Sequence, residues 1–247
     1  MKSEENNSFW ISYSDLATGL LLLFVLIIVM MLLSHKKEIE ALQGIRKALI
    51  VQLKQAFDKE HLEVDIDPKT GAIALRTEVL FDEDKYELKE LGKVYLRNFI
   101  VPYYSTLLNS DWCKALDNEN EKPCDSYIKY IIIEGHANQK GDYQYNLDLS
   151  GKRASEVAKF ILSYDMNLEA SLKNKLKTRL ALTGRSYAEP KYYNADVPKG
   201  YDINAACESQ NLPSIYVDCE KSKRVEFKFL LVEEDEIEKS KIELLGY

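Results

Sequence analysis

The sequence IIIEGHANQKGDYQYNLDLSGKRASEV occupies residues 131–157 and carries the clearest structural pattern of the chain. Three isoleucines open it, as in a buried strand, and we expect this strand to end at Gly135. A polar loop follows, after which Asn146 is predicted to open an amphipathic helix that contains Leu149 and Arg153. A strand, a loop and a helix in this order indicate a mixed α+β unit.

Strands and helices alternate on both sides of this stretch. We predict a hairpin over residues 62–79, a helix over 82–108 and further strands over 178–187 and 224–233. The sequence therefore predicts an α+β domain over residues 61–233, with an acidic tail over 234–247.

The N-terminal segment reads as a membrane span. Phe9 to Leu33 is 25 residues long and has no charge after residue 18. At ~1.5 Å per residue a helix of this length reaches roughly 37 Å, enough for a ~30 Å hydrocarbon core. A signal peptide would need a basic start and a small-residue cleavage site, which this sequence lacks. We expect a tail over residues 1–8 and a retained transmembrane helix over residues 9–34.

Residues 35–60 have apolar side chains at helical spacing, including Ile39, Leu42, Leu49 and Leu53. They predict a membrane-proximal amphipathic helix. Two arrangements stay open: the helix pairs with a copy of itself, or it packs back on its own domain.

The four cysteines form two close-spaced pairs in polar sequence. Cys113 and Cys124 make one pair, and Cys207 and Cys219 make the other. Such spacing favours local disulfides, which form in an oxidising compartment, while four reduced thiols are the alternative. The spacing is too wide for typical zinc ligands, and we predict no metal site.

Charge gives weaker information about location and partners. The net charge of −7 argues against a nucleic-acid partner. Lys2 precedes the predicted span, whereas Lys36 and Lys37 follow it, so a count of positive charges mildly favours a cytoplasmic C-terminal domain. The predicted disulfides favour the opposite orientation.

The 131–157 stretch resembles the OmpA-like peptidoglycan-binding domain, whose signature is G-H-T-D followed by N-x-x-L-S-x-x-R-A. The matching residues are Gly135, His136, Asn146, Leu149, Ser150, Arg153 and Ala154. The resemblance implies an OmpA-like α/β sandwich whose peptidoglycan-binding residues are Asn138, Tyr145, Asn146, Leu149 and Arg153.

The chemistry of this motif suits a wall peptide. Arg153 offers a planar fork for a carboxylate of the stem peptide. Asn138 stands where the family has an aspartate, which removes a charge, and Asp142 is a possible substitute. The alternative is that Asn146, Ser150 and Arg153 only cap the helix and pair on its surface.

Asp15 is an acid at the mouth of the apolar segment. An ionisable residue inside a membrane span suggests function by default. The alternative is that Asp15 is the N-cap of a helix that starts at Leu16.

Residues 9–18, FWISYSDLAT, resemble the F-W-x-S-Y-A-D-L-M-T segment of MotB-type stator subunits, and the match is strongest to the ZorB-type subunits of Zorya anti-phage systems. Ser14 and Ala17 depart from the pattern. The resemblance implies that Asp15, with Thr18, carries H⁺ or Na⁺. It also implies a homodimer inside a pentameric MotA/ZorA-like membrane subunit, an inner-membrane location, a cytoplasmic N-terminus and a periplasmic C-terminal domain.

These features together predict the wall-anchoring subunit of an ion-driven rotary motor, most similar to those of anti-phage defence. A flagellar stator subunit and a passive peptidoglycan anchor are the alternatives. We expect no enzyme activity and no cofactor beyond the translocated ion, because the sequence has no nucleophile, base and orienting group in a recognisable pattern. His136, alone at a strand end, is expected to be structural.

Overall fold

The fold is described from a computed structural model of the chain. It describes residues 2–62, 64–109, 123–164, 170–193, 207 and 216–232, and only the backbone of residues 2–9, 11, 12, 38, 41 and 171. The chain divides into two compact units, Met1–Gly44 and Ile45–Tyr247. The predicted acidic tail, residues 234–247, lies outside the described residues.

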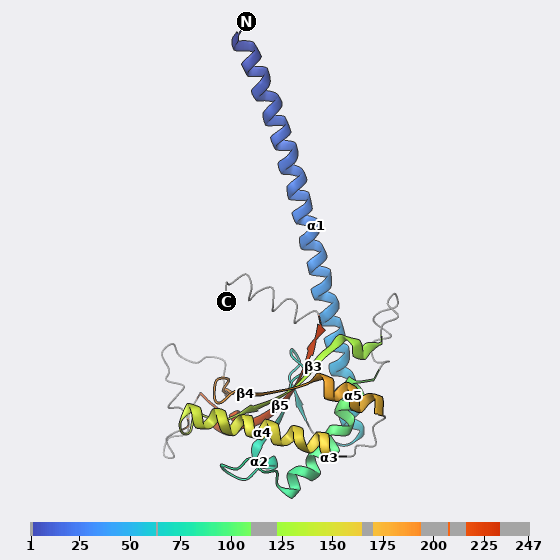
Figure 1. The fold of residues 1–247 in the computed structure, drawn as a ribbon, viewed down its shortest axis with the longest axis vertical. Helices are drawn as coiled ribbons and strands as arrows, with labels where there is room; N and C mark the ends of the chain where they lie inside the picture. The colour runs from blue at the N-terminus through green and yellow to red at the C-terminus, as the bar shows by residue number, and fades with distance from the viewer. Residues whose placement is uncertain are drawn as a thin grey trace. The chain divides into compact units, whose positions relative to one another are not determined.

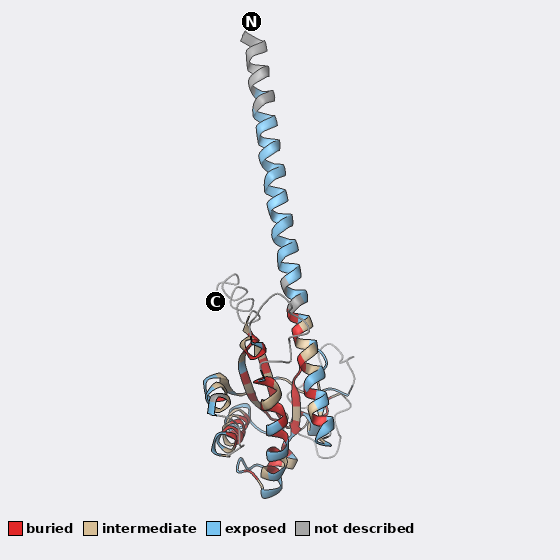
Figure 2. Cartoon of the chain, turned by 90° about the vertical axis from the view of Figure 1, so that its right-hand side faces the viewer, coloured by how far each residue is buried: buried red, intermediate tan, exposed pale blue. Residues whose placement is uncertain are grey.

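Helix α1 spans Lys2–Lys59 and supplies the whole described part of the first unit. Within the described residues, length and composition single out one candidate membrane span, in Tyr13–Lys59, whose most apolar window has a mean hydropathy of 3.1 and no buried residue. Residues 13–37 are exposed along their whole length (Figure 2). Because α1 begins at Lys2, Asp15 lies inside the helix, and its alternative role as an N-cap at Leu16 is wrong.

A five-stranded sheet forms the centre of the second unit, in the order β1-β2-β5-β3-β4. The strands are β1 (Asp65–Ile66), β2 (Ile73–Arg76), β3 (Ile128–His136), β4 (Leu180–Gly184) and β5 (Arg224–Leu231). Strand β3 is central: it pairs antiparallel with β5 and parallel with β4. The antiparallel β1–β2 pair is the predicted hairpin. With the helices below, this arrangement confirms the predicted α+β fold.

Helices surround this sheet (Figure 1). They are α2 (Thr77–Leu80), α3 (Glu90–Leu107), the 3-10 helix η1 (Cys124–Tyr127), α4 (Tyr143–Ser163), α5 (Ala170–Arg179) and α6 (Cys219–Ser222). Helix α4 buries residues at helical spacing, among them Asn146, Leu149, Arg153 and Ala154. Its buried side therefore includes the polar residues of the sequence motif.

The core lies between the sheet, α3 and the last turns of α1. Phe99 of α3 is fully buried, and its ring centroid lies 4.7 Å from that of Phe227 in β5 and 5.3 Å from that of Phe57 in α1. Leu53 and Leu49, one and two turns before Phe57, have no exposed surface. The C-terminal part of α1 thus packs back on its own domain, which is the second of the two arrangements left open by the sequence.

Some boundaries differ from the predicted ones for local reasons. Helix α4 starts at Tyr143, not at Asn146, because the side chain of Asp142 caps it. Residues 77–80 form a helical turn where a strand was predicted, and the following helix begins only at Glu90. Helix α5 was not predicted; its sequence ASLKNKLKTR is too polar to show an apolar periodicity.

Cys207 and Cys219 form a disulfide with their Cα atoms 5.9 Å apart. Cys124 is also disulfide-bonded. Its predicted partner, Cys113, lies outside the described residues.

Candidate functional site

All five residues predicted to bind peptidoglycan line one groove at the start of α4. The groove has a volume of about 790 Å³, and its walls include Asn138, Tyr145, Asn146, Leu149 and Arg153. The loop after β3 supplies one wall, the first turns of α4 supply the second, and residues 78–89 supply the third. The structure therefore brings together residues that the sequence motif places on a strand end and on a helix.

Glycine allows α4 to lie directly against the strands. A Cβ atom on Gly135 of β3 would come within 2.0 Å of the backbone oxygen of Ser150, and one on Gly184 of β4 within 2.7 Å of the backbone nitrogen of Gly151. The hydroxyl of Ser150 accepts a hydrogen bond of 3.1 Å from the backbone N–H of Ser186. Ser150 thus holds α4 in place and does not face the groove.

Most polar side chains at the entrance of the groove already make hydrogen bonds within the protein. Asp142 accepts hydrogen bonds from the backbone N–H groups of Gln144 and Tyr145 at 2.9 and 3.1 Å. Asn138 accepts one from the backbone of Lys140 at 3.2 Å. Asn146 donates to the carbonyl oxygen of Lys140 at 2.9 Å. Asp142 therefore serves as the N-cap of α4, which argues against the role of substitute for the family aspartate.

Arg153 is the buried cation of the groove, with only 5% of its surface exposed. Its Nε donates to the carbonyl oxygen of Lys85 at 2.9 Å, and its guanidinium lies 5.3 Å from the centre of the Phe81 ring. No carboxylate in the described part of the chain forms an ion pair with it. Burial lowers the pKa of Arg153, and the nearby Asp84 partly offsets this effect. A buried guanidinium without a counter-ion is suited to bind an anion.

The alternative in which Asn146, Ser150 and Arg153 only cap the helix and pair on its surface does not fit this geometry. Arg153 and Asn146 are both buried, and both line the groove. Sequence spacing could not identify the groove's other wall, because Phe81 and Lys85 lie far from Arg153 in the sequence; Lys85 is 68 residues away.

His136 belongs to a separate charged cluster at the end of the sheet. Its Nε2 lies 3.5 Å from Glu134 and 3.7 Å from Glu226. Ligand atoms of Glu134, His136 and Glu189 lie within 4.8 Å of one another. Lys228, however, pairs with Glu134, and Arg185 pairs with Glu189, so both carboxylates already have basic partners. We interpret the cluster as a structural ion-pair network.

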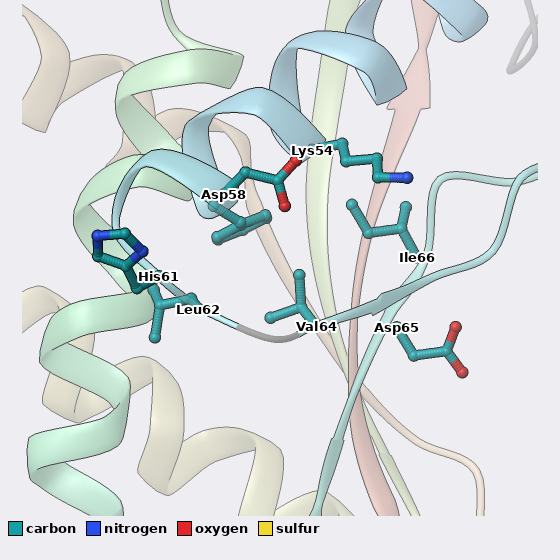
Figure 3. Close-up of a pocket in the computed structure, with 8 residues that line it drawn as sticks. Lys54, Asp58, His61, Leu62, Val64, Asp65 and Ile66 are labelled. Carbon is teal, nitrogen blue, oxygen red and sulfur yellow. The ribbon is translucent and has the colours of Figure 1, made fainter.

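A second pocket lies beside the C-terminal end of α1 (Figure 3). Its lining residues come from α1 and from the segment that leads into β1: Lys54, Phe57, Asp58, His61, Leu62, Val64, Asp65 and Ile66. Its charged side chains are all exposed. Among the described residues, no predicted site residue lines this pocket, and none of the lining residues is a buried charge comparable to Arg153.

Asp15 and Thr18 lie on α1, in the other unit of the chain. The hydroxyl of Thr18 donates to the backbone oxygen of Ser14, one turn earlier. The carboxylate of Asp15 makes no hydrogen bond within the described part of the chain. It is therefore a single acid on an apolar, exposed stretch of helix.

No family model matches the chain. A solved structure described as a MotB-like protein, from Desulfovibrio vulgaris, is similar with a TM-score of 0.43 at 18% identity, and the match covers 77% of this chain and 93% of that chain.

Curated proteins that are similar in sequence include two named Zorya protein ZorB and one lipoprotein. The Zorya protein ZorB of Escherichia coli strain Crooks is 27% identical over 207 residues, which are 76% of this chain and 81% of ZorB. A peptidoglycan-associated lipoprotein of Buchnera aphidicola is 31% identical over 83 residues, which are 34% of this chain and 45% of the lipoprotein. The chain is thus similar to ZorB over most of its length and to the lipoprotein over a shorter part.

Proposed function

We propose that this chain is the wall-anchoring subunit of an ion-driven inner-membrane rotary motor of the MotAB/ZorAB type, and that the motor serves anti-phage defence. The observation that carries the anchoring part is Arg153: a buried guanidinium that lines a groove and forms no ion pair with a carboxylate of the described residues. The similarity to ZorB over 81% of its length supports the choice of motor.

In this proposal the groove binds the stem peptide of peptidoglycan. A stem peptide presents carboxylates, and Arg153 can hold one through two parallel charge-assisted hydrogen bonds. Tyr145 and Leu149 supply the flanking walls. The name of the Buchnera relative, a peptidoglycan-associated lipoprotein, agrees with this ligand.

Asp15 supplies the ion-carrying part of the proposal. An aspartate costs about 2.5–3.5 kcal/mol at the centre of a membrane helix on insertion scales, and less near the end of the span, where Asp15 lies. Neutralisation by H⁺ or Na⁺ lowers this cost and lets the side chain pass an apolar wall. One charge that crosses 100 mV releases about 2.3 kcal/mol, which a surrounding ring of partner subunits can convert into rotation. Two copies of α1 inside a pentameric MotA/ZorA-like subunit, with the C-terminal domain in the periplasm, would allow the wall-bound domain to resist this rotation.

The anchoring part is tested by the binding of purified full-length protein, in detergent, to insoluble peptidoglycan sacculi. Arg153→Ala and Arg153→Lys are expected to weaken co-sedimentation about tenfold or more, because each removes the planar fork. Arg97→Ala is the matched control: Arg97 also lies over aromatic rings, those of Phe160 and Tyr164, but it does not line the groove.

Thermal unfolding of each variant separates loss of binding from loss of fold. If a folded Arg153→Lys protein co-sediments as well as the wild type does, Arg153 is not part of the wall-binding site.

A further inference from the structure

The acids that line the groove differ in whether they have a partner. Of the six acids among the described lining residues, five have a partner within the chain. Asp142 caps α4, and the other four form ion pairs. These pairs are Glu78 with Arg76 at 3.1 Å, Asp82 with Lys85 at 3.4 Å, Glu83 with Lys140 at 3.4 Å and Glu220 with Lys223 at 2.7 Å. The sixth, Asp84, makes no hydrogen bond and no ion pair within the described part of the chain. Among the described acids of the groove, it is the one that stays available to a ligand.

Asp84 also has an unusual backbone conformation. Its backbone has a φ of 54°, in the left-handed region that is uncommon for residues other than glycine and is tolerated best by aspartate and asparagine. Its side chain is exposed, and its charge partly offsets the lowering of the Arg153 pKa that burial causes. The two side chains nevertheless form no direct ion pair. The groove therefore holds a buried guanidinium, that of Arg153, and a nearby carboxylate, that of Asp84, which form no ion pair with each other.

Building on the proposed wall-binding function, we propose that Asp84 binds the ammonium group of the ligand whose carboxylate is bound by Arg153. The groove then selects a zwitterionic amino-acid centre, such as that of diaminopimelate in a stem peptide, over a simple carboxylate. Asn138 and Asp142 do not fill this role, because the first is neutral and the second is held by the backbone of α4.

Two soluble probes separate the contributions of the two charges. Meso-diaminopimelate carries carboxylates and ammonium groups, whereas pimelate has the same carbon chain and carboxylates without the ammonium groups. We expect the full-length protein in detergent to bind diaminopimelate more tightly than pimelate when measured by calorimetry. Asp84→Asn, which keeps the shape and suits the left-handed backbone, should weaken diaminopimelate binding about tenfold and leave pimelate binding unchanged.

Glu90→Gln is the matched control, because it removes the same charge from an exposed carboxylate outside the groove, which is paired with Lys93 at 2.7 Å. It should change both affinities by less than about twofold. The role of Asp84 is overturned if Asp84→Asn keeps the preference for diaminopimelate, or if it weakens both probes equally. A wild-type protein that binds neither sacculi nor diaminopimelate would overturn the proposed wall-binding function itself.

Discussion

His136 is almost completely buried between two carboxylates at the end of the sheet, with 1% of its surface exposed. Burial lowers its pKa, and Arg224 acts in the same direction, while Glu134 and Glu226 oppose them. Burial also disfavours the charged form of Glu134, but His136 and Lys228 outweigh this effect and lower the pKa of Glu134 to about 2. The cluster is thus arranged around a neutral histidine and ionised glutamates.

This arrangement makes the stability of the domain depend on pH. The unfolded chain protonates His136 near its ordinary pKa of 6.5 while the folded chain does not, so this part of the stability is present above pH 6.5 and is lost as the pH falls below it. The contribution of Glu134 is present above pH 4.5 and is lost as the pH falls towards 2. We expect the unfolding temperature to fall between pH 7 and pH 5.5, and again below pH 4.5.

The first decline should be much smaller in a His136→Gln variant, and circular dichroism melts of both proteins would measure it. An equal decline in the two proteins between pH 7 and pH 5.5 would show that His136 does not cause it.

At the residue scale, the sequence motif identified the groove residues that come from the β3–α4 segment. Asn146, Leu149 and Arg153 follow a helical spacing that can be recognised without a structure. Asp84 could not be recognised in this way, since its role depends on the pairing of every neighbouring acid. Which charges remain unpaired is a property of the folded surface.

At the scale of elements, the contact between β3 and α4 sets the position of the groove. The close approach at Gly135 places the backbone of α4 where any side chain on that strand residue would collide with it. The N-cap at Asp142 then fixes where the helix begins and so which residues face the groove.

Gly135→Ala is therefore expected to destabilise the domain by about 3 kcal/mol, because backbone atoms, unlike the end of a flexible side chain, cannot move aside at low cost. Gly151→Ala is the matched control on α4: a Cβ there meets no atom within 4 Å, and alanine is the better helix former. Thermal unfolding of the two variants should show a large decrease for the first and no decrease for the second. Equal stabilities would contradict the close packing of β3 on α4.

Elements with a strong apolar pattern were predicted well, and those without one were not. The isoleucine-rich strand β3 and the apolar part of α1 were recognised directly from the sequence. Helix α5 is too polar to be detected by periodicity, and the short turn α2 takes its shape from its neighbours: the backbone N–H of Thr77 donates to the carbonyl oxygen of Lys223, 3.1 Å away. Such tertiary contacts are not visible in a local pattern.

At the scale of the whole molecule, the chain combines a helix whose exposed apolar stretch carries one acid, Asp15, with a domain whose groove is lined by the buried guanidinium of Arg153. Each part has a plain physical reading on its own: the helix as a membrane span and the domain as a binder. A motor subunit requires both, because an ion-carrying helix that is not anchored would turn together with its partner.

The most direct test of this account is Asp15→Asn in the native operon, with the membrane level of the protein checked by immunoblot. Asparagine keeps the shape of the side chain and removes the ionisable group. Ser14→Ala is the matched control, because it removes only a hydroxyl that donates to the backbone oxygen of Trp10. We predict that Asp15→Asn abolishes protection against phage, that Ser14→Ala retains it, and that swimming is unaffected by either. Full protection by a normally expressed Asp15→Asn protein would contradict the ion-carrying role, and loss of swimming alone would identify a flagellar stator subunit instead.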